Sequence, residues 1–133
     1  MHRPQFYSIH KHHHEYHTAI SIAGQAAHPF EHLIANTFPS FIGYKILSYF
    51  YPVHCISVWV FLVFRIVESI DAHTGYEWSW AQSELLPFSA GAACHVFHHT
   101  YNAGNFGSFF KVWDSLFGTN AEYIKYRKQQ LIL

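Results

Sequence analysis

Charged residues are scarce in this 133-residue sequence, where they make up 12% of the chain. An ordinary soluble domain carries about twice that share. Because eight Lys and Arg balance eight Asp and Glu, the chain has no basic excess with which to bind a nucleic acid. Cys55 and Cys94 are too few for a disulfide scaffold and lack zinc-finger spacing. The first residues have no apolar run, so no signal peptide is expected, and the length predicts one domain.

Apolar residues are abundant instead: half of the chain is hydrophobic and 20% is aromatic. Two nearly uncharged segments, 30–51 and 53–67, are separated by a turn near Tyr51-Pro52. This pattern fits either a helical hairpin that enters a membrane and returns, or two core helices of a soluble protein. The low charge and the aromatic content favour the membrane. The basic tail at 123–128 then predicts that both ends of the hairpin face the cytosol.

Three further segments carry helical patterns, at 5–20, 94–101 and 108–118. We therefore predict an all-α fold, in which an integral membrane hairpin supports a cytosolic, histidine-rich helical cap.

Thirteen histidines are the most unusual feature of the composition, and six of them form two copies of one motif. The copies are His10-x-x-His13-His14 and His95-x-x-His98-His99. Positions i, i+3 and i+4 share one face of a helix, so two facing helices would bring six imidazoles into one pocket. Imidazole binds iron, zinc, copper or nickel, and this many nitrogen ligands suits two metals better than one. The alternative, a solvated polar helix face, is less compatible with two copies.

Other histidines have more varied roles in this interpretation. His73 follows the apolar segment and is predicted to point into the site, because Arg65 and Glu68 can pair with each other. Glu77 is a candidate for a ninth ligand. His17 and His28 are expected to support ligands through hydrogen bonds. His12 is expected on the surface, and His54 is expected to be structural.

The motifs resemble the fatty acid hydroxylase superfamily and, within it, the C4-methylsterol oxidases most. Ile9-His10-Lys11-x-His13-His14-Glu15 is similar to the second histidine box, and His95-x-x-His98-His99 is similar to the third. The other similar stretches are His28-Pro29-x-Glu31, Arg65-x-x-Glu68-x-x-Asp71-Ala72-His73-x-Gly75-Tyr76, Asn105-Phe106-Gly107 and Trp113-Asp114-x-x-Phe117-Gly118-Thr119. His2 matches the last histidine of the first box, and Val96 stands where the third box usually has Asp. The resemblance places residues 1–133 in the C-terminal part of such a domain, truncated before or within the first box.

This resemblance implies a multi-pass di-iron monooxygenase of the endoplasmic reticulum membrane, with its site facing the cytosol. It would use dioxygen to hydroxylate a membrane lipid, with a C4-methyl sterol as the expected substrate, in lipid and sterol biosynthesis. Electrons would come from NAD(P)H through cytochrome b5 or its reductase, and zinc could replace iron in a purified sample. The expected metal ligands are His2, His10, His13, His14, His73, His95, His98 and His99.

Other functions stay open at this point. A sterol desaturase or a fatty acyl hydroxylase would share the same histidine boxes, because substrate specificity depends on the pocket. A non-catalytic membrane subunit could keep the fold, and exposed apolar surface makes an oligomer or partner subunit plausible. A soluble, histidine-rich zinc or nickel carrier fits poorly with the apolar stretch at 46–67.

Overall fold

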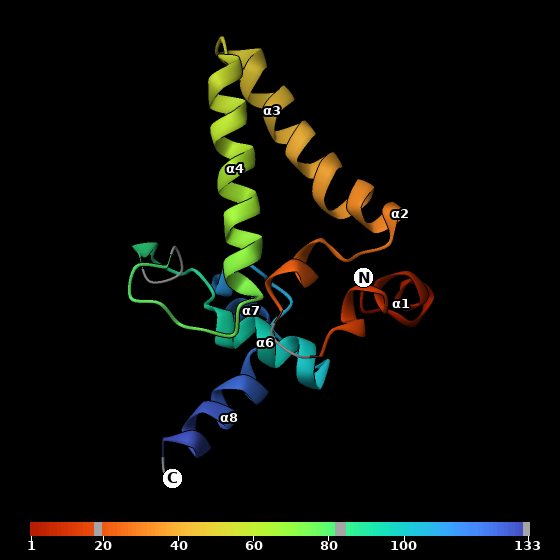
Figure 1. The fold of residues 1–133 in the computed structure, drawn as a ribbon, viewed down its shortest axis with the longest axis vertical. Helices are drawn as coiled ribbons and strands as arrows, with labels where there is room; N and C mark the ends of the chain where they lie inside the picture. Colours follow the sequence, from red (N-terminus) through yellow and green to blue (C-terminus); the bar gives the residue numbers. More distant parts are fainter. Residues whose placement is uncertain (18–19, 82–84, 132–133) are drawn as a thin grey trace.

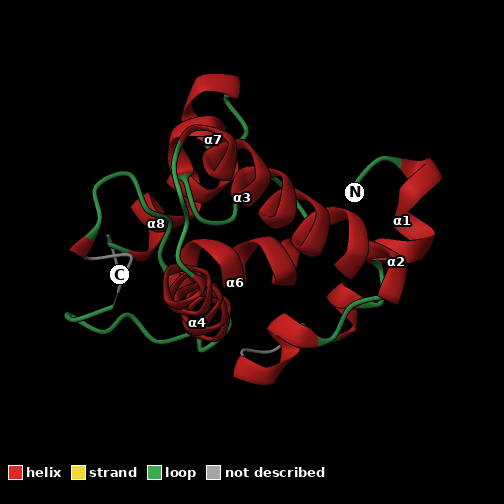
Figure 2. Ribbon diagram, turned by 90° about the horizontal axis from the view of Figure 1, so that it is seen from above, coloured by secondary structure: helices red, strands yellow, loops and turns green. Residues whose placement is uncertain are grey.

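The computed structural model describes residues 1–17, 20–81 and 85–131. Within these ranges the regular structure is helical, apart from one isolated bridge between Ser89 and Phe110. Figure 2 shows helices joined by loops in every part of the described chain. The all-α prediction is therefore confirmed.

The N-terminal segment departs from the single helix predicted at 5–20, of which residues 18 and 19 lie outside the described ranges. Helix α1 spans Pro4–His10, with Pro4 in its first turn, where proline loses no helical hydrogen bond. The chain then tightens into the 3₁₀ turn η1, His13–Glu15. The prediction of one long helix was therefore wrong, because the α-helix ends at His10 and the next regular turn is a 3₁₀ turn.

A second 3₁₀ turn, η2 (Ser21–Gln25), precedes the helical hairpin. The first arm of the hairpin consists of α2 (Pro29–Glu31), the π-helical turn η3 (His32–Thr37) and α3 (Phe38–Phe50). Pro39 does not break this arm, because it lies in the first turn of α3, after the wider π-helical turn.

The second arm of the hairpin is α4, Cys55–Ala72. The two arms join at residues 51–54, where the turn was predicted, and diverge toward the rest of the molecule (Figure 1). His54 accepts a hydrogen bond from the backbone N–H of Ile56 at 3.2 Å, which confirms its structural role as the cap of α4. Among the described residues, no helix combines the length and the apolarity needed to cross a membrane.

The C-terminal part holds three helices, α6 (Ala92–Tyr101), α7 (Lys111–Phe117) and α8 (Ala121–Gln130). α6 and α7 lie near the base of α4, and α8 projects away from the hairpin (Figure 1). Asn102 ends α6 and Gly118 ends α7, each in the left-handed conformation that closes many helices. α6 and α7 correspond to the segments predicted at 94–101 and 108–118, whereas α8 forms in the tail that was predicted only to be basic.

The interior of the described part is more polar than apolar. Five apolar side chains are buried, all small except Phe97, whereas eleven polar ones are buried, including six histidines. The large apolar side chains of the hairpin are instead exposed, as with Leu47 and Trp59, which are 50% and 68% exposed. Buried imidazoles need partners, and the next question is which partners these have.

Candidate metal centre

All eight histidines predicted as ligands come together, in two groups of four. Group A consists of His2, His10, His14 and His98; group B consists of His13, His73, His95 and His99. Within each group, one ring nitrogen of every member lies within 4.8 Å of the corresponding nitrogens of the others. The rings of His14 and His99 stack at 4.6 Å, so the two groups adjoin.

Each histidine motif is divided between the groups, which corrects the expectation of six imidazoles in one pocket. The i, i+4 pair His10 and His14 enters group A, whereas His13 between them enters group B. On α6 the i, i+4 pair His95 and His99 enters group B, and His98 enters group A. The repeated spacing therefore gives every motif a donor for each of two sites.

The spacing of the inward nitrogens fits a shared ion. In group A, His10 Nε2 lies 2.9 Å from His2 Nε2 and 3.0 Å from His14 Nε2. In group B, His95 Nε2 lies 3.0 Å from His73 Nε2 and 3.1 Å from His99 Nε2. Imidazole nitrogens bound to one ion at about 2.0–2.1 Å, at angles between a right angle and the tetrahedral angle, are about 2.8–3.4 Å apart.

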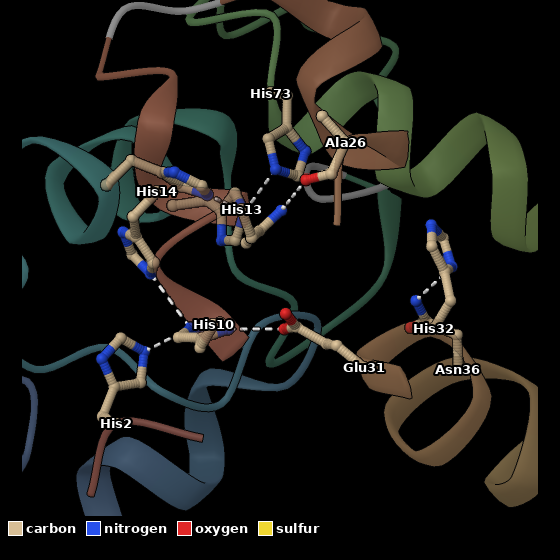
Figure 3. Close-up of polar contacts among 11 residues, drawn as sticks. His2, His10, His13, His14, Ala26, Glu31, His32, Asn36 and His73 are labelled. Atoms are coloured by element: carbon tan, nitrogen blue, oxygen red, sulfur yellow. Dashed lines mark hydrogen bonds and ion pairs between the residues drawn. The ribbon is translucent and has the colours of Figure 1, made fainter. Parts of the chain in front are cut away.

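The outer nitrogens of four rings donate to fixed acceptors, and this determines their tautomers. In group A, His10 Nδ1–H donates to Glu31 Oε1 at 2.5 Å, and His98 Nδ1–H donates to the Gly104 carbonyl at 2.6 Å. In group B, the Nδ1–H of His13 donates to the Ala26 carbonyl at 3.2 Å, and that of His73 donates to the Ser69 carbonyl at 2.7 Å. Figure 3 shows Glu31 reaching His10 from the side opposite His2 and His14.

These hydrogen bonds leave inward lone pairs. Because a backbone carbonyl carries no proton, Nδ1 must hold the hydrogen in His13, His73 and His98, and the ionised Glu31 carboxylate gives His10 the same tautomer. Nε2 is then left as an unprotonated acceptor. Each group therefore contains at least two lone pairs directed at the same small space. Within each group the converging nitrogens lie within 4.8 Å of one another, and unprotonated imidazole nitrogens are donors that a transition-metal ion takes, so the donor set fits a metal ion in each group.

Burial also keeps the rings neutral. Desolvation lowers the pKa of His2 and His14 to about 3 and that of His99 to about 2, and neighbouring imidazoles add to the effect. The pKa values of His10 and His73 fall to about 4 for the same main reason, and burial lowers that of His95 as well. Neutral imidazole is the form that binds metal.

Some predicted supporting residues lie elsewhere. Glu77, the candidate for a ninth ligand, belongs to neither group; its Oε2 lies 3.6 Å from a guanidinium nitrogen of Arg127, so that prediction was wrong. His28 does not touch a ligand; it is exposed and accepts the backbone N–H of Phe30 to cap α2. His17 lies 3.5 Å from the backbone carbonyl of His99 rather than from its ring. His12 pairs on the surface with Glu15, as predicted.

Glu31 supplies the role that was assigned to His28. Its side chain is buried, one oxygen accepts from His10, and burial raises its pKa. Its place in the motif His28-Pro29-x-Glu31 was the sequence signal that could have identified it. Backbone acceptors such as the Ser69 and Gly104 carbonyls leave no comparable signal. The predicted ion pair between Arg65 and Glu68 is present on α4.

A sequence profile of the fatty acid hydroxylase family matches residues 1–119. The chain belongs to the fatty acid hydroxylase family. The match covers both histidine motifs and every member of groups A and B. No solved structure matches this member of the family.

Several proteins are similar over most of the chain. Methylsterol monooxygenase 1 of Danio rerio is 38% identical over 125 residues, which are 94% of this chain and 41% of that protein. Methylsterol monooxygenase 1 of Rattus norvegicus is 38% identical over 97% of this chain and 43% of its own length. A very-long-chain aldehyde decarbonylase of Oryza sativa subsp. indica is 37% identical over 88% of this chain and 43% of its length. The fatty acid hydroxylase chain thus spans about two-fifths of these relatives.

Proposed function

We propose that the chain binds two iron ions, one in each histidine group, and takes part in the dioxygen-dependent oxidation of a membrane lipid. The observation that carries this proposal is the division of eight neutral imidazoles into two sets of four. A C4-methyl sterol is the best candidate substrate, because methylsterol monooxygenases are among the similar proteins. Residues 1–133 would then be the C-terminal part of a hydroxylase domain.

Iron held in these groups would supply the activation of dioxygen and the oxidation of an unactivated C–H bond. The chain's own residues hold the ligands in position. Glu31 and the Gly104 carbonyl fix two rings of group A, and the Ala26 and Ser69 carbonyls fix two rings of group B. Because these acceptors hold the Nδ1 protons, the Nε2 lone pairs stay directed inward without a rearrangement on binding.

An open cavity gives a lipid access to the two groups. Its volume is about 1830 Å³, and it lies between the two arms of the hairpin and the histidines. Phe41, Leu47 and Phe61 contribute to its apolar wall, while His10 and His95 contribute to its polar end. A wall of this composition favours a long apolar substrate that presents one end to the metals.

The hairpin is proposed to insert into the membrane of the endoplasmic reticulum, with the metal centre on the cytosolic side. Its apolar side chains are exposed, Lys45 is the one charge in α3, and residues 55–64 of α4 carry none. The uncharged part of α4 is about 15 Å long, half of the roughly 30 Å hydrocarbon core of a bilayer. Arg65 and Glu68 pair where α4 approaches the histidines, which would mark the edge of the inserted part.

Oxidation of this kind needs an electron supply. We propose that cytochrome b5 or its reductase delivers electrons from NAD(P)H at the cytosolic face. The exposed hairpin also leaves room for an oligomer or for a partner subunit that covers its apolar surface. Zinc is expected to bind in place of iron when the protein is purified in air, because both groups offer four nitrogen donors.

The test is product analysis with the full chain in lipid nanodiscs, loaded anaerobically with iron and supplied with cytochrome b5, its reductase, NADPH and dioxygen. A C4-methyl sterol that gains one oxygen atom supports the proposal, and His95→Ala is expected to abolish that product. A product that has lost two hydrogens would identify a desaturase instead. Binding of iron without any oxidised lipid would contradict the enzyme proposal and favour a non-catalytic subunit.

A second substrate class has one observation in its favour. The rice relative acts on a very-long-chain aldehyde by its name, and it is nearly as similar to this chain as the methylsterol monooxygenases. The substrate panel should therefore include a long-chain fatty acyl compound and a long-chain aldehyde beside the sterol. Consumption of the aldehyde in preference to the sterol would replace the sterol assignment while leaving the metal assignment intact.

A further inference from the structure

The motif at residues 105–107 and the motif at residues 113–119 contribute no ligand to either histidine group, yet they contain a buried carboxylate. Asp114 is 3% exposed and lies in the first turn of α7. Its Oδ1 accepts from the Phe106 backbone N–H at 2.7 Å and from the Thr119 hydroxyl at 2.6 Å. Its Oδ2 accepts from the Gly107 backbone N–H at 2.9 Å. One carboxylate therefore joins both motifs.

The second motif also holds the first through its backbone. The Asn105 N–H donates to the Thr119 carbonyl at 3.1 Å, and the Thr119 N–H donates to the Asp114 carbonyl at 2.9 Å. Gly104 lies against the Thr119 carbonyl with φ of +62°, and a Cβ there would be 2.1 Å from Thr119 O. The loop at 104–107 is thus fixed on one side by Asp114 and Thr119, with no room for a side chain at Gly104.

The other side of this loop faces group A. The Gly104 carbonyl accepts the Nδ1–H of His98 at 2.6 Å. The Phe106 ring lies 4.8 Å from the ring of His2 and 5.6 Å from that of His98. His2 precedes α1 and is the one member of group A that is not buried. Two of the four ligands of group A therefore rest on a loop whose position depends on Asp114.

We infer that Asp114 is a positioning residue for the metal ion of group A, acting through the loop at 104–107 on His98 and His2. The inference rests on the proposed metal-binding function. Group B does not depend on this loop for its two outer hydrogen bonds, since they end on Ala26 and Ser69. Loss of the Asp114 carboxylate weakens one metal site and spares the other.

Asp114→Asn tests the inference with little change in shape. An amide NH2 in the place of Oδ2 would face the Gly107 N–H, so two donors would meet where a donor and an acceptor met before. Thr119→Val is a milder variant that removes one hydrogen bond to Asp114, and Thr119→Ser should restore it. Glu122→Gln is the matched control, because Glu122 is exposed on α8 and also loses one carboxylate charge.

The measurement is an anaerobic Co²⁺ titration of the full chain in detergent, followed by visible absorption and elemental analysis. Wild type and Glu122→Gln are expected to bind two cobalt ions. Asp114→Asn should weaken one of the two sites by about 10–100-fold, the range for ligand-supporting residues, and leave the spectrum of the other unchanged. Thr119→Val should weaken the same site by less, and Thr119→Ser should bind as wild type does.

Two equal sites with unchanged spectra in Asp114→Asn would overturn the inference. Equal weakening of both sites would also overturn it, because Asp114 would then support the fold in general. If Asp114→Asn loses helicity by circular dichroism, Thr119→Val decides between these outcomes. A wild type that binds no cobalt would overturn the proposed metal-binding function itself, whereas failure in the variants alone would leave that function standing.

Discussion

Group A and group B each present four imidazoles, but different kinds of structure hold them. In group A the outer acceptors are a side-chain carboxylate, Glu31, and a carbonyl in a loop that Asp114 fixes. In group B they are two backbone carbonyls, Ala26 O beside η2 and Ser69 O in the last turn of α4. Ser69 O belongs to the helix-end carbonyls that lack a helical donor, and His73 supplies one from its own side chain.

This difference predicts that the two groups respond to different substitutions. Group A depends on buried carboxylates and on His2, which lies outside any helix. Group B depends on an 18-residue helix and on the close contact between η2 and α4. Changes of charge should therefore lower metal affinity mainly in group A, and changes of packing should lower it mainly in group B.

The largest separation is expected when a ligand itself is removed. His98→Ala should cost the ion of group A, and His73→Ala should cost the ion of group B, so each variant keeps one of two ions. The loss in affinity should exceed the roughly 10–100-fold effect of a supporting residue. Elemental analysis of the iron-loaded variants checks this. Loss of both ions from either variant would show that the groups form one inseparable site.

Packing is expected to separate the groups through Gly24. A Cβ at this position would lie 2.5 Å from Ser69 Oγ and 2.9 Å from His73 Nδ1, so Gly24→Ala must displace the ring of His73. Overpacking of this kind costs about 1–3 kcal/mol, and we expect metal affinity to fall in group B alone. Gly43→Ala is the matched control, since a Cβ there meets nothing within 4 Å. An equal effect at both sites would contradict the packing account.

Charge is expected to separate the groups through Glu31. Glu31→Gln keeps an oxygen that can accept from His10 but removes the negative charge beside the ring. We expect about 10-fold weaker binding in group A, the lower end of the range for such partners, and no change in group B. Ser69→Ala is the counterpart in group B and should be close to neutral, because the acceptor there is the backbone carbonyl. Competitive titration against a chelator measures the metal affinity of both variants. A larger loss of affinity in Ser69→Ala than in Glu31→Gln would contradict the comparison.

Acid is expected to destabilise the metal-free protein through both groups alike, so it should distinguish the two groups least. In the metal-free protein, burial holds the pKa of His10 and of His73 at about 4, below the ordinary value of 6.5. Between these values the unfolded chain binds more protons than the folded one, so the free energy of unfolding falls as pH drops. The free energy of unfolding should be highest above pH 6.5, where these rings are neutral in both states, and should decline as the pH falls toward 4. Thermal unfolding at a series of pH values checks this, and a melting temperature that rises on acidification would contradict it.

Four features could be predicted from the sequence: the convergence of the eight histidines, the turn near Tyr51, the ion pair of Arg65 with Glu68 and the structural role of His54. Motif spacing, charge and apolar runs are properties of side chains, which a sequence states directly. That the eight histidines bind metal stays a prediction.

The division of each motif between two groups could not be predicted from the shared helix face alone. It occurs on α6, which is a regular helix, as well as at the tight turn after His10, so it depends on how the neighbouring elements pack around each motif. Carbonyl acceptors such as Gly104 O are invisible for another reason: every residue has one, and only the fold selects which is used. The prediction for Glu77 was wrong because its distance from His73 along the chain does not determine the path of the loop between them. In the structure Glu77 lies beside Arg127.

The most direct test of the account is the number of iron ions that the wild-type chain binds, measured by anaerobic Fe²⁺ titration and elemental analysis of detergent-purified protein. Two groups of four imidazoles predict two ions per chain. No bound iron, or a single ion that the eight histidines share, would contradict the claim that the chain contains two metal sites.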